Sequence, residues 1–184
     1  MVSAGVVALG EIGDKTQLLA LLLAARWRRP VPIILGILFA TLANHAAASA
    51  LGAWLTRVVD PLWLRWALGL SFLGVAAWML VPDKPEALRD SGPGRLGVFG
   101  ITFVAFFLAE MGDKTQIATV MLAAKYQSLW VVTAGTTLGM MIANVPAVLL
   151  GDRVVTKLPV RWVHRIAAAV FAVLGGLVLA GFGS

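Results

Sequence analysis

The sequence contains no cysteine and little charge. The absence of cysteine excludes disulfide bonds and thiolate metal ligands. Only 13% of the 184 residues are charged and 60% are hydrophobic, whereas about a quarter of the residues in a soluble domain are charged. This composition predicts an integral membrane protein.

The basic residues lie in short connections between apolar runs, although the net charge is +6. This placement is typical of membrane orientation, so we expect no nucleic-acid partner. No basic segment precedes the first apolar run and no small-residue cleavage site follows it. We therefore expect that run to be a retained span and not a signal peptide.

Six apolar segments approach the roughly 20 residues that a membrane-spanning helix requires. The connection at 82–96 is the longest, and its Pro, Gly and charged residues indicate a linker between two halves. We predict an all-α membrane protein with a first repeat at 1–81, a cytoplasmic linker at 82–96 and a second repeat at 97–184. The six expected transmembrane helices are 2–25, 31–56, 62–81, 97–124, 129–151 and 162–182.

The two halves resemble each other in sequence. EIGDKTQ at 11–17 returns as EMGDKTQ at 110–116, and LAARW at 23–27 parallels LAAKY at 122–126 at the same spacing. After a one-residue insertion, LANHAA parallels IANVPA. Each half would hold three spans, and an odd number forces the second copy to enter the membrane from the opposite side. The sequence therefore predicts two inverted three-helix repeats with a site between them.

The distribution of Lys and Arg predicts the orientation. Ten of them flank the connections after the first, third and fifth spans, and three lie on the opposite side. Because cytoplasmic loops carry the excess of positive charge, we expect both termini outside the cytoplasm.

Charged side chains also lie inside the first and fourth predicted spans. On a continuous helix, Glu11, Asp14 and Lys15 would share one face, because they are three and four residues apart. An unpaired charge inside a membrane costs from ~2.5 to more than ~10 kcal/mol. The two charged faces should therefore meet inside the protein. The second face would carry Glu110, Asp113 and Lys114.

Four carboxylates and two ammonium groups would leave two uncompensated negative charges. Such a site suits one divalent cation or two protons, which favours a cation antiporter. Without thiols the donors are oxygen atoms, which suit Mg²⁺, Ca²⁺ and Mn²⁺. We expect Glu11 and Glu110 to carry the exchanged protons. The expected metal ligands are Glu11, Asp14, Glu110, Asp113, Asn44 and Asn144.

Other polar residues of these segments have more than one interpretation. Asn44 and Asn144 could hydrogen-bond between helices, and each aspartate could pair with a lysine. His45 has no counterpart in the second half; we interpret it as a core histidine with satisfied hydrogen bonds, with a proton relay as the alternative. Lys15 and Lys114 are expected to balance charge or gate the site. The expected surrounding polar contacts are Thr16, Gln17, Thr115 and Gln116.

Paired Glu-x-Gly-Asp-Lys-Thr/Ser motifs in a 3+3 arrangement resemble the family that contains the Golgi manganese/calcium transporter and bacterial manganese exporters. Both motifs are complete, and the resemblance covers the whole chain. It implies exchange of protons for Mn²⁺ or Ca²⁺ leaving the cytosol, with Glu11, Asp14, Glu110 and Asp113 forming the ion site. The short linker is similar to that of a prokaryotic plasma-membrane member.

We predict a secondary active transporter whose two halves rock about the site, and not an enzyme. The chain has no His-Glu-x-x-His or Gly-x-Ser-x-Gly motif. The expected partners are membrane lipid, a divalent cation and protons, with Mn²⁺ or Ca²⁺ as substrate and no cofactor. An exporter of a cationic amino acid and a passive divalent-cation channel are the alternatives. The oligomeric state is left open, and a monomer is compatible with the sequence.

Overall fold

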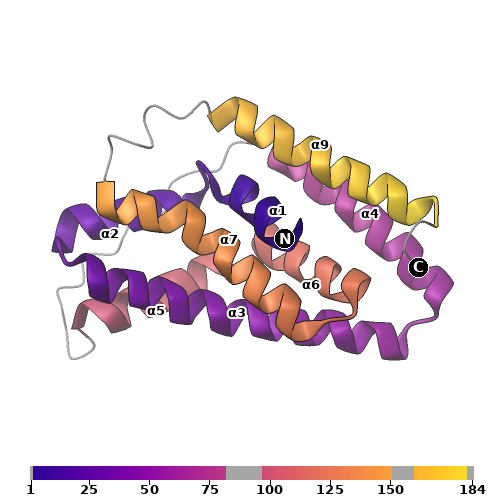
Figure 1. The fold of residues 1–184 in the computed structure, drawn as a ribbon, viewed down its shortest axis with the longest axis horizontal. Coiled ribbons are helices and arrows are strands. Elements are labelled where there is room, and N and C mark those ends of the chain that lie inside the picture. Colours follow the sequence, from indigo (N-terminus) through magenta and orange to yellow (C-terminus); the bar gives the residue numbers. More distant parts are fainter. Residues whose placement is uncertain (1, 82–96, 151–159, 182–184) are drawn as a thin grey trace.

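The computed structural model describes residues 2–81, 97–150 and 160–181, and each regular element within them is an α-helix. The predicted linker at 82–96 lies outside the described residues, as do five of the basic residues counted for orientation, Lys84, Arg89, Arg95, Arg153 and Lys157. The helices, shown in Figure 1, are α1 (Val2–Glu11), α2 (Lys15–Trp27), α3 (Pro30–Val58), α4 (Pro61–Met79), α5 (Gly97–Glu110), α6 (Lys114–Tyr126), α7 (Leu129–Leu150) and α9 (Val160–Leu179).

Four of the described helices are long and apolar enough to cross a membrane. They are α3, α4, α7 and the Arg161–Leu179 part of α9, and they fall on the second, third, fifth and sixth predicted spans. α1 and α5 are apolar but shorter. The prediction of an all-α membrane protein is therefore confirmed for the described residues.

The predicted first and fourth spans are each broken into two helices at the charged heptapeptide. α1 ends at Glu11 and α2 begins at Lys15, while α5 ends at Glu110 and α6 begins at Lys114. The expectation of one continuous helical face that carries acids and lysine is therefore wrong. Each glutamate instead ends one helix, and each aspartate immediately precedes the next.

A glycine makes each break possible. Gly13 has a φ of +82° and Gly112 a φ of +74°, a region where a residue with a side chain is strained. The N–H of Gly13 donates to Oε1 of Gln17 at 2.8 Å, and that of Gly112 donates to Oε1 of Gln116 at 2.7 Å. The repeated Gly-Asp-Lys-Thr-Gln thus encodes both the turn and the side chain that closes it.

The helices of the two halves pack on each other reciprocally. α1 packs along α7, α5 packs along α3, and α4 pairs with α9. A methyl group on Gly139 of α7 would lie 2.5 Å from the carbonyl oxygen of Ala4, and one on Gly52 of α3 would collide with the carbonyl oxygen of Val120. Such close packing at small residues is typical of membrane helices.

The α4–α9 pair lies along one edge of the other helices (Figure 1), where α9 contacts α1 and α4 contacts α6. In the part of the chain that the structure describes, no comparable packing joins α4 to α5 or α9 to α2. The two breaks are therefore covered unequally. Nε2 of His164 on α9 lies 2.9 Å from the carbonyl oxygen of Ile12 at the first break, whereas Met111 and Gly112 at the second break are exposed.

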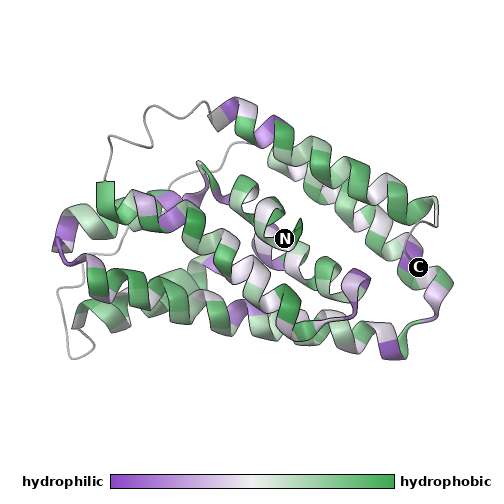
Figure 2. Cartoon of the chain, in the orientation of Figure 1, coloured by the Kyte–Doolittle hydropathy of each residue, from purple (hydrophilic) through white to green (hydrophobic). Residues whose placement is uncertain are grey.

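Apolar residues predominate along most of the helices (Figure 2), and many large ones are exposed, including Trp63, Trp130 and Trp162. A large exposed apolar surface is unusual for a soluble protein and suits contact with lipid. The acids of the two heptapeptides are buried instead. Charge is thus directed inward, as the cost of exposing it to lipid requires.

Candidate cation site

The two helix breaks bring buried carboxylates together. Glu11, Asp14, Glu110 and Asp113 are each no more than 2% exposed. Ligand atoms of Glu11, Asp14 and Asp113 lie within 4.8 Å of one another. The structure therefore assembles three of the four expected carboxylates into one cluster with contributions from both halves of the chain. Glu110 is also buried, but its carboxylate faces His45.

Two ion pairs cross between the halves. Nζ of Lys114 lies 2.5 Å from Oδ1 of Asp14, and Nζ of Lys15 lies 3.2 Å from Oδ1 of Asp113. The Lys114–Asp14 pair is fully buried, whereas the side chain of Lys15 is 21% exposed. Each lysine thus compensates the aspartate of the other half. With all groups ionised, the two glutamates carry the remaining negative charge.

Threonine hydroxyls from both halves hold the carboxylate of Glu11. Oγ1 of Thr16 donates to Oε2 of Glu11 at 2.5 Å, and Oγ1 of Thr115 donates to Oε1 of the same carboxylate. Hydrogen bonds to a charged acceptor are stronger than those between neutral groups. Two of the polar residues expected around the site therefore orient this carboxylate and link α2 and α6 to it.

The carboxylate of Glu110 is held differently. Neither of its oxygens accepts a hydrogen bond from the described residues, and Nε2 of His45 on α3 lies 3.5 Å from Oε1. His45 is fully buried, and neither ring nitrogen has a hydrogen-bond partner within the described chain. The interpretation of His45 as a core histidine with satisfied hydrogen bonds is therefore wrong.

The glutamines that close the two breaks also reach other helices. Nε2 of Gln17 donates to the carbonyl oxygen of Ala143 at 2.9 Å, and Nε2 of Gln116 lies 3.4 Å from Oδ1 of Asn44. Nδ2 of Asn44 donates to the carbonyl oxygen of Phe107 at 3.0 Å. Both ends of the Asn44 amide are thus used between helices, which favours the structural interpretation of this residue.

Asn144 is less constrained than Asn44. Its Nδ2 donates to the carbonyl oxygen of Met140 in its own helix at 3.0 Å. Its Oδ1 is buried and accepts no hydrogen bond from the described residues. A buried oxygen without a partner is costly, and a bound cation would remove that cost. The Oδ1 atom of Asn144 is therefore available as a metal ligand.

Sequence reasoning missed two features of this region. The lysines form ion pairs across the two halves, and no spacing rule predicts contacts between distant segments. His164, which lies against the first break, was not singled out because its sequence neighbours carry no motif.

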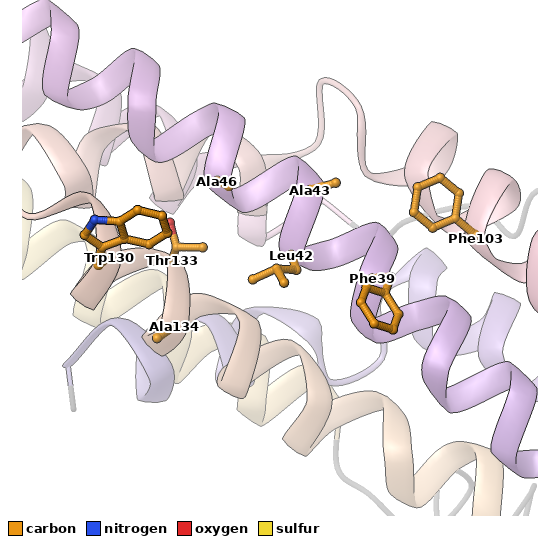
Figure 3. Close-up of a pocket in the computed structure, with 8 residues that line it drawn as sticks. All are labelled: Phe39, Leu42, Ala43, Ala46, Phe103, Trp130, Thr133 and Ala134. Carbon is orange, nitrogen blue, oxygen red and sulfur yellow. The ribbon is translucent and has the colours of Figure 1, made fainter.

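A separate apolar pocket of about 500 Å³ opens between α3, α5 and α7 (Figure 3). Thr133 supplies a hydroxyl to its lining, and that hydroxyl lies 3.5 Å from the backbone oxygen of His45. No carboxylate lines this pocket, so it is not the cation site. The lining residues are Phe39, Leu42, Ala43, Ala46, Phe103, Trp130, Thr133 and Ala134.

Helices long and apolar enough to span a membrane, around a buried cluster of acids paired with lysines, are typical of a class of protein, the integral membrane transporters of ions. The family model described as "Divalent cation/proton antiporter GDT1" matches residues 1–87 and 98–182. The chain therefore belongs to this family of divalent cation/proton antiporters, and the resemblance found from the two motifs is confirmed. A transporter family agrees with the expectation that the chain is not an enzyme.

Curated relatives include two bacterial proteins. A protein of Vibrio cholerae named "Putative manganese exporter" is 49% identical over 178 residues, which cover 94% of this chain and 86% of the relative. "GDT1-like protein sll0615" of Synechocystis is 30% identical over 183 residues, which cover 90% of this chain and 88% of the relative. No solved structure matches the chain significantly.

Proposed function

We propose that this protein is a secondary active transporter that exports divalent cations, Mn²⁺ foremost, from the cytosol in exchange for protons. The observation that carries the proposal is the buried cluster of Glu11, Asp14 and Asp113, drawn from both halves of the chain. Family membership supports cation/proton exchange. The name of the Vibrio cholerae relative supports manganese as the cargo.

In the proposed layout, each broken pair of helices counts as one span, which gives six spans in two inverted repeats at 1–81 and 97–184. The reciprocal packing of α1 on α7 and of α5 on α3 supports this symmetry. The excess of Lys and Arg in alternate connections supports both termini outside the cytoplasm, and the bacterial relatives support a multi-pass protein of a prokaryotic inner membrane.

In the proposed cycle, a divalent cation enters from the cytosol and replaces protons on Glu11 and Glu110. The cation binds to carboxylate oxygens, aided by Oδ1 of Asn144. After the site opens to the other side, protons return to the glutamates and the cation leaves. Lys15 and Lys114 keep the two aspartates charged and in place throughout.

The unequal covering of the two breaks supports alternating access. Because α1 packs on α7 and α5 packs on α3, the two three-helix halves interlock. The α4–α9 pair is therefore a better moving unit than either half. By the pseudo-symmetry of the repeats, the alternate state would pack this pair against α5 and α2 and uncover α1 and α6.

A transport assay in proteoliposomes tests the function. We expect Mn²⁺ uptake driven by an outward proton gradient, with alkalinisation of the lumen that requires Mn²⁺. Uptake that follows the Mn²⁺ gradient and ignores the proton gradient would indicate a channel. Proton movement coupled to lysine and not to Mn²⁺ would indicate an amino-acid exporter. Either of these results would contradict the proposal.

Cross-linking tests the moving unit, since the chain has no cysteine of its own. In the double variant Ile12→Cys/His164→Cys, a short bifunctional thiol reagent should join α9 to the first break, where the native residues are in contact. We expect Mn²⁺ transport to fall to the rate of protein-free liposomes, because α9 can no longer leave α1. The two single-cysteine variants, treated with the same reagent, control for modification alone. Full transport by the cross-linked protein would refute the movement of α9.

A further inference from the structure

The two glutamates of the site have different neighbours. Glu11 accepts hydrogen bonds from the hydroxyls of Thr16 and Thr115. Glu110 accepts none from the described residues and faces the imidazole of His45 at 3.5 Å. One end of the site is therefore built from oxygen atoms alone, and the other adds a nitrogen atom.

This difference originates in the sequence of α3. Asn44 is followed by His45, whereas its counterpart Asn144 in α7 is followed by Val145. The repeat thus supplies an imidazole to one side of the site and a hydrocarbon side chain at the corresponding position of the other. Neither ring nitrogen of His45 has a hydrogen bond within the described chain, although the residue is fully buried. A buried polar group without a partner is costly and calls for an explanation.

The contact between His45 and Glu110 has the spacing of two ligands that share one ion. Two donor atoms that each lie about 2.1 Å from a metal, at an angle of 90 to 110°, are roughly 3 to 3.5 Å apart. Nε2 of His45 and Oε1 of Glu110 are 3.5 Å apart. The pair can therefore accept a cation between its two atoms with little movement of either side chain.

We propose that His45 is a nitrogen ligand of the transported cation, beside Glu110, and that it makes the site select transition-metal dications such as Mn²⁺ over Ca²⁺. The inference rests on the proposed function, because it names a further ligand of the same site. Ca²⁺ binds almost entirely to oxygen atoms, whereas imidazole binds first-row transition metals well. A site built from oxygen atoms alone would accept both Mn²⁺ and Ca²⁺, whereas an added imidazole ligand favours the transition-metal ion.

Selectivity is the measurement that tests the role of His45. Proteoliposomes with wild-type protein, His45→Gln, His45→Ala and the matched control Val145→Ala would be assayed for proton-coupled transport of Mn²⁺ and Ca²⁺. We expect the Mn²⁺/Ca²⁺ ratio to fall by about tenfold or more in both His45 variants, the range seen when supporting groups of metal sites are lost. Val145→Ala should keep the wild-type ratio. Retained Ca²⁺ transport in the His45 variants would show that they are folded.

Pulsed electron paramagnetic resonance of the Mn²⁺-loaded protein gives a second readout that a purely structural role would not change. Nitrogen coupling to Mn²⁺ should be present in the wild type and in His164→Gln, and absent in His45→Gln. Because the chain has two histidines, the signal can be assigned. An equal loss of Mn²⁺ and Ca²⁺ transport in the His45 variants, or nitrogen coupling that survives in His45→Gln, would overturn the inference. A wild-type protein that exchanges neither Mn²⁺ nor Ca²⁺ for protons would instead overturn the proposed function.

Discussion

Replacing Glu11 or Glu110 with glutamine should reduce proton-coupled Mn²⁺ transport to the rate of protein-free liposomes. Glutamine keeps the size of the side chain but can neither release a proton nor supply a negative charge. Both glutamates are buried, and the lysines already compensate the two aspartates. Each substitution therefore removes half of the negative charge that is left for the cation. The measurement is Mn²⁺ uptake together with lumenal pH in the same liposomes.

Asp60→Asn is the matched control for these variants. Asp60 precedes α4, and its Oδ1 accepts a hydrogen bond from the N–H of Leu62 at 2.9 Å. Asparagine can replace aspartate at a helix N-terminus with little loss, so transport should remain at the wild-type rate. Wild-type exchange by both glutamine variants would refute the assignment of Glu11 and Glu110.

Lys114→Met should destabilise the protein more than any other single substitution discussed for this site. It leaves Asp14 as a buried charge without its compensating ammonium group, and breaking a buried ion pair in this way costs about 3–5 kcal/mol. Lys15→Met should cost less, because Lys15 is 21% exposed and water can partly replace the lost partner of Asp113. Thermal unfolding of the purified proteins in detergent, followed by tryptophan fluorescence, measures the difference.

The double variant Asp14→Asn/Lys114→Met separates stability from transport. Removing both charges should recover most of the lost stability, because neither member of the pair is then left as a buried charge without the other. Transport should nevertheless be absent in the double variant, since Asp14 belongs to the carboxylate cluster. If Lys114→Met unfolds at the wild-type temperature, or if the double variant is no more stable than the single one, the pair does not have the structural role inferred here.

Much of the architecture could be predicted from the sequence, because membrane helices need long apolar segments. Four described helices fall on predicted spans. The breaks at Gly13 and Gly112 were missed because three- and four-residue spacing was read as evidence of a continuous helix. A signal for them was present, since a glycine followed by an aspartate can end one helix and begin another. The positive φ of both glycines agrees with the second interpretation, in which Gly-Asp marks a break between two helices.

The content of the site was more predictable than its contacts. The cost of burying charge predicts that the acids and lysines of the heptapeptides lie inside the protein, and the burial of the four acids and of Lys114 agrees with it, whereas Lys15 is 21% exposed. The exchange of partners between Lys15 and Lys114 depends on how the halves pack, which local spacing does not encode. The contact of His45 with Glu110 joins α3 to α5, and no repeat signal marked it because the second half has valine at the corresponding position.

The glutamine side chains that close the two breaks limit where the protein can flex. Gln17 ties the turn before α2 to that helix, and Gln116 does the same for α6. A turn tied in this way is a poor hinge, because bending it would break the hydrogen bond that closes it. The angle between the two helices of each broken span should therefore stay constant through the transport cycle. Conformational change would then consist of the α4–α9 pair sliding over the broken helices, while the acidic cluster stays nearly undistorted.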